Sequence, residues 1–120
     1  MRQYRDAVIS SEQMLIIKKF DETVNYLYPI LQNAPRKHGV LRSEIQSGLF
    51  NQVKLFIEAG KSNQKSKLYM CDAGLANLRY LLRFATNAKR RLLTTHQHEV
   101  ALIQISECGA MLNAWLKKIR

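Results

Sequence analysis

Hydrophobic residues recur every three or four positions along most of this chain. In the first quarter they fall at Ile17, Phe20, Val24, Leu27 and Leu31. This interval is the period of an α-helix with one apolar face, and no strand-like alternation competes with it. The pattern predicts a first helix over about residues 11–33, beginning near Ser10, because Ser10 and Gln13 have the spacing of a capping box. Pro29 predicts a kink or a loosened last turn.

Three further segments show the same period. Their apolar positions are Leu41, Ile45, Leu49, Val53 and Phe56, then Leu68, Cys71, Leu75, Leu78, Leu82 and Ala85, then Ala101, Ile105, Cys108, Leu112, Trp115 and Ile119. The predicted helices cover about residues 40–59, 63–90 and 95–119. Gly60 is expected to end the second helix in the left-handed conformation. Thr94 and Gln97 have the spacing of a capping box at the start of the fourth.

Short breaks separate these segments, at residues 35–39, 59–63 and, more weakly, 91–95. Connections this short leave consecutive helices antiparallel, and steps of three and four suit helices packed at about +20°. The predicted fold is therefore all-α: an antiparallel up-down four-helix bundle, forming a single domain over residues 1–120.

Length and composition agree with one compact domain. The chain has 120 residues, of which 47% are hydrophobic, enough to form a core. No apolar run approaches the roughly 18 residues that a membrane span requires. The N-terminus is followed by no secretory hydrophobic segment, so we expect a soluble, cytoplasmic protein with no membrane partner.

Charge is the property that changes the picture most. Nineteen Lys and Arg residues against nine Asp and Glu give a formal net charge of +10. Residues 61–94 hold eight of these cations and a single acid, Asp72. Such an imbalance favours a polyanionic partner, whether a nucleic acid, an acidic protein or an anionic membrane surface.

The cations of the third predicted helix fall on one side of it. On a wheel of 100° per residue, four of them lie within about 40° of one another, beside the apolar seam. This basic stripe consists of Lys65, Arg79, Arg83 and Arg90. Lys61 would extend the stripe if the helix reached back that far, and Arg36 and Lys37 lie near the first break.

A solvated helix face is the ordinary explanation of such a charge run. However, Arg79 and Arg83 form a like-charge pair at i,i+4, which slightly destabilises an isolated helix. Arginine also suits phosphate and carboxylate because of its planar fork. The stripe is therefore a candidate binding surface. Nearby aromatic residues (Tyr69, Tyr80 and Phe84) suit either packing between helices or stacking on bases.

Catalysis finds little support in the sequence. His96 and His98 point about 200° apart on a helix, and a histidine at a helix start or in a turn, such as His38, is more often a surface residue. Cys71 and Cys108 lie on apolar seams and are expected to be buried hydrophobic residues rather than nucleophiles. We predict no catalytic residue, no metal site and no cofactor, and interpret the protein as a binding protein.

An ordered set of short motifs closely resembles one known family, Avd, the accessory variability determinant of phage-borne diversity-generating retroelements. The similarity runs from about residue 12 to residue 118. The motifs are Gln13–Ile16, Tyr26–Ile30, Pro35–Val40, Ala59–Gln64, Ser66–Tyr69, Asp72–Ala76, Leu82–Phe84 and the Gly109-x-Met-Leu-x-x-Trp115 ending. Residues 89–93 match none of the family's motifs, so any role for Arg90 rests on charge alone.

The resemblance implies a four-helix bundle that assembles into a homopentameric barrel with a basic surface. It also implies a non-enzymatic accessory factor, which binds the element's reverse transcriptase and its template RNA, and possibly DNA. In that family the factor supports mutagenic retrohoming, in which cDNA copied from a template repeat and mutated at adenines replaces a variable repeat. The implied setting is the cytoplasm of a bacterial host.

Two alternatives remain open on the sequence. The first is an RNA-associated bundle protein of the type encoded in 23S rRNA intervening sequences, which shares the bundle but has no polymerase partner. The second is a helical module that binds an acidic protein and no nucleic acid. The candidate residues for binding nucleic acid or the reverse transcriptase are Lys65, Arg79, Arg83, Arg90, Lys61, Arg36 and Lys37.

Overall fold

The computed structural model describes the backbone of residues 2–119 and the side chains of residues 12–119. Within that range every regular element is a helix and none is a strand. The elements are α1 (Arg2–Gln32), the short 3₁₀ helix η1 (Arg36–His38), α2 (Gly39–Ser62), α3 (Lys65–Thr86) and α4 (Thr95–Lys118). The all-helical prediction is confirmed.

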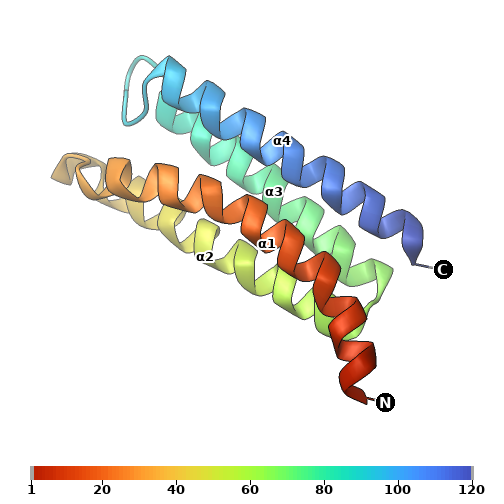
Figure 1. Cartoon of the computed structure of the whole chain (residues 1–120). Helices are drawn as coiled ribbons and strands as arrows, with labels where there is room; N and C mark the ends of the chain where they lie inside the picture. The colour runs from red at the N-terminus through yellow and green to blue at the C-terminus, as the bar shows by residue number, and fades with distance from the viewer. Residues whose placement is uncertain (1, 120) are drawn as a thin grey trace.

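The four long helices form an elongated body of 53 × 21 × 20 Å. Helix α1 packs on α2 and α4, and α3 packs on the same two helices, whereas in the described part of the chain the backbones of the diagonal pairs α1–α3 and α2–α4 do not come close together. Figure 1 shows the α1–α2 and α3–α4 connections at one end of the body and the α2–α3 connection at the other. The bundle therefore has four seams, one between each pair of neighbouring helices.

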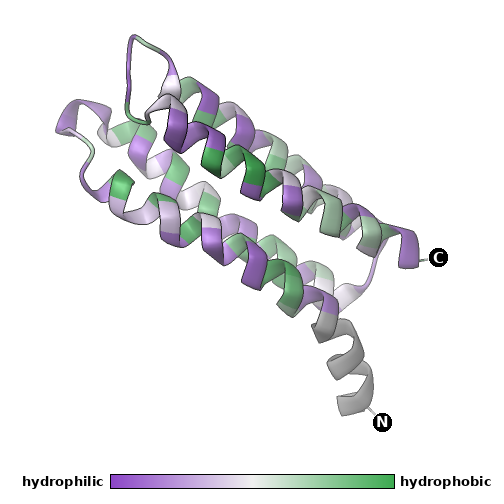
Figure 2. Ribbon diagram, turned by 45° about the horizontal axis from the view of Figure 1, so that its top comes forward, coloured by the Kyte–Doolittle hydropathy of each residue, from purple (hydrophilic) through white to green (hydrophobic). Residues whose placement is uncertain are grey.

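The apolar period predicted the core of α3 completely, since all six expected residues are buried. In α4 the first five expected positions are buried, and Ile119 packs partly buried against them. Figure 2 shows hydrophobic residues recurring along the helices, while the connection between α1 and α2 is largely hydrophilic. Two polar side chains, Thr23 and Gln52, join the core.

Helix α1 begins earlier than predicted. It starts at Arg2, so Ser10 lies inside the helix and the expected capping box with Gln13 is wrong. Residues 2–10 contain neither Gly nor Pro, and nothing in them interrupts a helix. The helix passes through Pro29 and ends at Gln32.

Helix α2 ends later than predicted, and Gly60 is not its cap. Asn63 takes the left-handed conformation instead, with φ of 53°, and its N–H donates to the Ala59 carbonyl. Asparagine is the residue that adopts this conformation most readily after glycine. Gly60 is buried, and a Cβ there would collide with the side chain of Gln13. The absence of a side chain at Gly60 allows α1 and α2 to approach each other closely at this point.

Helix α3 ends at Thr86 rather than near residue 90, so Arg90 lies in the α3–α4 connection. The Asn87 carbonyl accepts hydrogen bonds from the N–H groups of Arg90 and Arg91, both at 2.9 Å. The following Leu92 and Leu93 are buried, and their N–H groups donate to the Ala85 carbonyl. Burial of these two leucines turns the chain back over the end of the core, which sequence periodicity does not show.

Helix α4 begins where it was predicted to begin. Thr94 Oγ1 accepts from the Gln97 N–H at 3.0 Å, and Gln97 Oε1 accepts from the Thr94 N–H at 2.9 Å. This reciprocal capping box satisfies two donors at the start of the helix and fixes the backbone of its first turns. None of the helices in the described part of the chain is both long and apolar enough to cross a membrane.

Candidate nucleic-acid interface

The edge of α3 that faces α4 carries the two arginines of the basic stripe. Six buried residues, from Leu68 to Ala85, fix the rotation of α3, and this rotation turns Arg79 and Arg83 towards the seam with α4. Arg79 is half-buried in the seam and Arg83 is exposed at its edge. Lys65 is exposed 18 residues before Arg83, about 27 Å away along the helix at 1.5 Å per residue.

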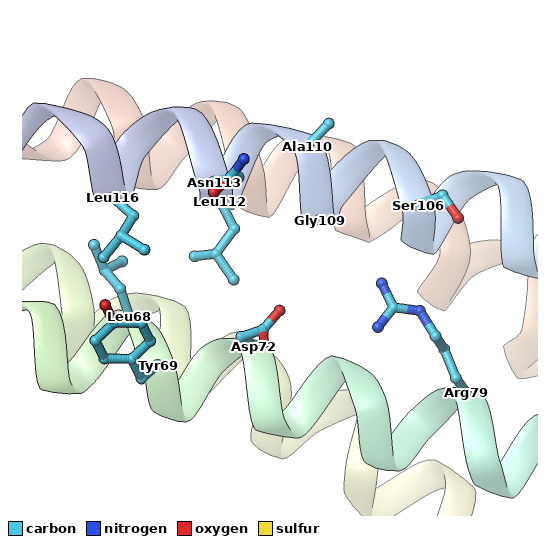
Figure 3. Close-up of a pocket in the computed structure, with 10 residues that line it drawn as sticks. All are labelled: Leu68, Tyr69, Asp72, Arg79, Ser106, Gly109, Ala110, Leu112, Asn113 and Leu116. Carbon is cyan, nitrogen blue, oxygen red and sulfur yellow. The ribbon is translucent and has the colours of Figure 1, made fainter.

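A groove of about 490 Å³ opens along this seam, shown in Figure 3. Its α3 wall includes Asp72 and Arg79, and its α4 wall includes Ser106, Gly109 and Asn113. Small residues on α4 leave the groove open at its centre, where Figure 3 shows the Arg79 side chain reaching from α3 towards α4. The groove therefore has a mixed polar and apolar lining, with one cation and one acid.

Gly109 gives the Arg79 guanidinium its place against α4. A Cβ at Gly109 would lie 3.2 Å from Arg79 Nη2, closer than an ordinary van der Waals contact. Arg79 thus rests on the α4 backbone at a point where only glycine leaves full room. This contact holds the guanidinium in the seam rather than in bulk solvent.

The arginines of α3 have no ionic partner within residues 12–119. The ion pairs found there join Lys19 to Glu22 and to Glu107, and Lys118 to Glu12. Asp72 lines the same groove as Arg79, yet the two side chains form no ion pair. The positive charge of this seam is left available to an external anion.

Aromatic rings alternate with arginines at the end of the seam next to the α3–α4 connection. The rings of Tyr80 and Phe84 lie 6.2 Å apart, and both are exposed. The Arg83 guanidinium lies 5.9 Å from the Tyr80 ring centre, and that of Arg90 lies 3.4 Å from the Phe84 ring centre. The connection thus returns Arg90 to the face of α3, although Arg90 is not part of the helix as predicted. Exposed rings beside cations are typical of surfaces that stack on bases.

The other predicted binding residues do not join this cluster. Lys61 belongs to the last turn of α2, so it does not extend the basic stripe along α3 as proposed from the sequence. Arg36 and Lys37 are exposed in η1, between α1 and α2. Figure 1 shows this turn at the same end of the bundle as the α3–α4 connection, and the α2–α3 connection at the opposite end.

The cysteines have the environment of core residues. Cys71 and Cys108 are both fully buried, as predicted. Burial raises the pKa of the Cys71 thiol to about 12 and that of the Cys108 thiol to about 12. A thiol with such a pKa holds almost no thiolate near neutral pH, which makes it a poor nucleophile. Within the described residues, no three His, Cys, Asp or Glu side chains gather closely enough to hold a metal ion.

His98 differs from the surface residue expected at a helix start. It is half-buried against α3, and its Nε2 atom is buried without a hydrogen-bond partner in the described structure. His96, two residues earlier, is exposed. Sequence spacing could have marked the difference, because His98 precedes the buried Ala101 by three residues and Ile105 by seven.

A model of a protein family, described as bAvd-like, matches residues 14–119. The chain belongs to the bAvd-like family. The match spans all four helices and confirms the resemblance to Avd that the sequence motifs indicate. No curated protein matches the chain at a significant level.

Proposed function

We propose that this bAvd-like protein is a non-enzymatic accessory factor of a diversity-generating retroelement. It binds the element's reverse transcriptase and template RNA, and possibly DNA, in the bacterial cytoplasm and so supports mutagenic retrohoming. Family membership supports the setting. The observation that carries the binding role is the seam between α3 and α4, where Arg79 and Arg83 have no ionic partner among residues 12–119.

The proposed active form is a homopentameric barrel of up-down bundles, as the resemblance to Avd implies. Repetition of the basic face would turn a few weak phosphate contacts per subunit into one multivalent surface. With a formal charge of +10 per chain, five copies carry about +50. Affinity for RNA should therefore fall steeply with salt, in proportion to the number of phosphates neutralised.

Co-purification with the reverse transcriptase encoded beside this protein, with and without nuclease, tests the proposal. Recovery that survives nuclease would support direct contact with the polymerase. Recovery that requires intact RNA would make the RNA the bridge between the two proteins. No recovery under either condition would contradict the accessory role and favour an RNA-associated bundle of the rRNA intervening-sequence type.

A further inference from the structure

A second, smaller hollow continues the α3–α4 seam towards the α3–α4 connection. We call it the arginine–histidine slot. It is lined by Ala76, Arg79, Tyr80 and Arg83 of α3 and by His98 and Leu102 of α4. Its volume of about 340 Å³ lies at the lower end of the roughly 300–1,000 Å³ found for ligand pockets.

The charged groups that line the slot are the two guanidinium groups of Arg79 and Arg83, which are hydrogen-bond donors only. No carboxylate is among the residues that line it, and Asp72 lines the neighbouring groove instead. The slot is therefore built to receive an anion.

His98 adds a donor from the opposite wall. Its backbone is fixed, because its N–H donates to the carbonyl of the helix cap Thr94 at 3.0 Å. Its Nε2 atom is buried and has no hydrogen-bond partner in the described structure. Buried polar atoms are nearly always paired, so the His98 Nε2 atom, buried without a partner on the wall of this hollow, has a hydrogen bond left to offer to a ligand.

Tyr80 narrows the class of anion. Its ring lines the slot and is 53% exposed, with the Arg83 guanidinium over it. A ligand that matches both the cations and the ring carries a phosphate next to an aromatic base. A nucleotide unit has this chemistry, whereas an acidic side chain supplies only the anion.

We propose that the arginine–histidine slot seats one backbone phosphate of a single-stranded nucleic acid. The guanidinium groups of Arg79 and Arg83 contact it from α3, and a rotation of the His98 side chain brings its buried Nε2–H to donate to it from α4. The neighbouring base lies on Tyr80. This assignment rests on the proposed nucleic-acid-binding function and adds His98, which neither the charge pattern nor the family motifs single out.

The test compares three variants of the full-length protein: His98→Ala, His98→Gln and His96→Ala. The side-chain amide of glutamine can still donate a hydrogen bond, and His96 is an exposed control two residues away on the same helix. Binding of a fluorescent single-stranded RNA is measured by anisotropy at fixed salt. We expect His98→Ala to weaken binding by about ten- to a hundredfold, the loss of one hydrogen bond to a charged group. His98→Gln should retain most of the affinity, and His96→Ala should leave it unchanged.

A second measurement does not depend on RNA. Inorganic phosphate is titrated into protein with labelled histidine, and the ring resonances are followed by NMR. We expect the His98 ring signals to shift and those of His96 to stay. Thermal unfolding of each variant shows whether the bundle is intact. If His98→Ala does not fold, the phosphate titration of the unaltered protein still tests the proposal, because an absent His98 shift would contradict it.

Several results would contradict the proposal that the slot seats a backbone phosphate. One is unchanged RNA affinity in both His98 variants, even with a phosphate-induced shift, which would mark an adventitious ion only. Another is a loss of reverse transcriptase binding in His98→Ala while RNA binding is unchanged, which would point to a carboxylate of a protein partner. Failure of the proposed function is distinguishable, because the wild-type protein itself would then bind no RNA.

Discussion

The two seams of α4 differ in whether their polar side chains are paired within the chain. On the α1 side, Lys19 Nζ lies 2.7 Å from Glu107 Oε2, and Lys118 pairs with Glu12. The hydrogen bond from Lys19 to Glu107 raises the pKa of the lysine. Thr23 Oγ1 donates to Gln104 Oε1 at 2.9 Å in the same seam. This seam is closed by contacts within the chain.

On the α3 side of the same helix, the polar groups lack such partners. Arg79, Arg83 and His98 line one hollow, and none of them forms an ion pair within residues 12–119. A chain that needed only to fold could have placed acids here, as it did opposite Lys19 and Lys118. We infer that the α1–α4 seam serves stability and the α3–α4 seam serves binding.

The largest expected effect comes from reversing charge in the α3–α4 seam. Arg79→Glu combined with Arg83→Glu removes two phosphate contacts and adds repulsion. RNA affinity should fall by about a hundredfold or more, at about 1.5–3 kcal/mol for each hydrogen bond to a charged group. Unfolding of the bundle should change little, because neither arginine forms an ion pair within residues 12–119.

A matched control makes the same change of charge in the other seam. Lys19→Glu with Lys118→Glu breaks the contacts to Glu107 and Glu12, so it should lower the stability of the bundle. Its effect on RNA affinity at matched salt should be much smaller than that of the arginine pair. Equal losses of affinity for the two double variants would mean that only net charge matters.

Thr23→Val should have an effect on stability alone. The substitution removes the part-buried hydrogen bond to Gln104, which typically costs about 1 kcal/mol of unfolding free energy. Urea unfolding measures this loss, while RNA anisotropy should be unchanged. Ser47→Ala is a suitable control because Ser47 is exposed on α2, a helix that borders neither seam of α4. The comparison of seams would be weakened if Thr23→Val altered RNA binding without altering stability.

Gly109→Ala should move stability and binding in opposite directions. Alanine in a helix interior is favoured over glycine by up to about 1 kcal/mol, so the bundle should become slightly more stable. The added methyl group lies 3.2 Å from Arg79 Nη2, so the guanidinium must shift by a few tenths of an ångström. We expect an approximately twofold loss of RNA affinity. Gly39→Ala, which meets no atom within 4 Å, should show no such loss.

RNA binding is expected to have its smallest effect on the two buried thiols, whose reactivity should not change. Cys71 and Cys108 should resist alkylation at pH 8 in the folded protein and react fully in denaturant, because burial raises the pKa of each thiol to about 12. The unfolded thiols ionise near their ordinary pKa of 9.0, so this contribution to stability is present below pH 9 and is lost as pH rises towards 12. Rapid labelling of the RNA complex would show that binding opens the core, contrary to our account.

Sequence periodicity predicted the parts of the fold that depend on local geometry. The six core positions of α3 and the capping box at Thr94 are examples. The end of α3 was missed because burial of Leu92 and Leu93 outweighs the helix propensity of residues 87–90. Gly60 was wrongly predicted to cap α2. Its actual position, against Gln13 of α1, is a tertiary feature that the local sequence does not show.

The candidate site was also predicted only in part, because the sequence shows which residues share a helix face but not which helices lie together. The wheel placed Arg79 and Arg83 on one edge of α3, and the structure turns that edge towards α4. The wheel could not identify His98, since the proposed role of this residue depends on a hollow formed by two helices. Lys61 was misplaced because the sequence left the boundary between α2 and α3 uncertain by a few residues.

Photo-crosslinking of bound RNA, followed by identification of the crosslinked peptide, tests the central claim most directly. Our account predicts crosslinks in α3, at Tyr80 and Phe84, whose exposed rings lie beside Arg83 and Arg90. Crosslinks should disappear when excess salt releases the RNA. Crosslinks confined to α1 and α2, with α3 unlabelled, would contradict the assignment of the α3–α4 seam as the nucleic-acid interface.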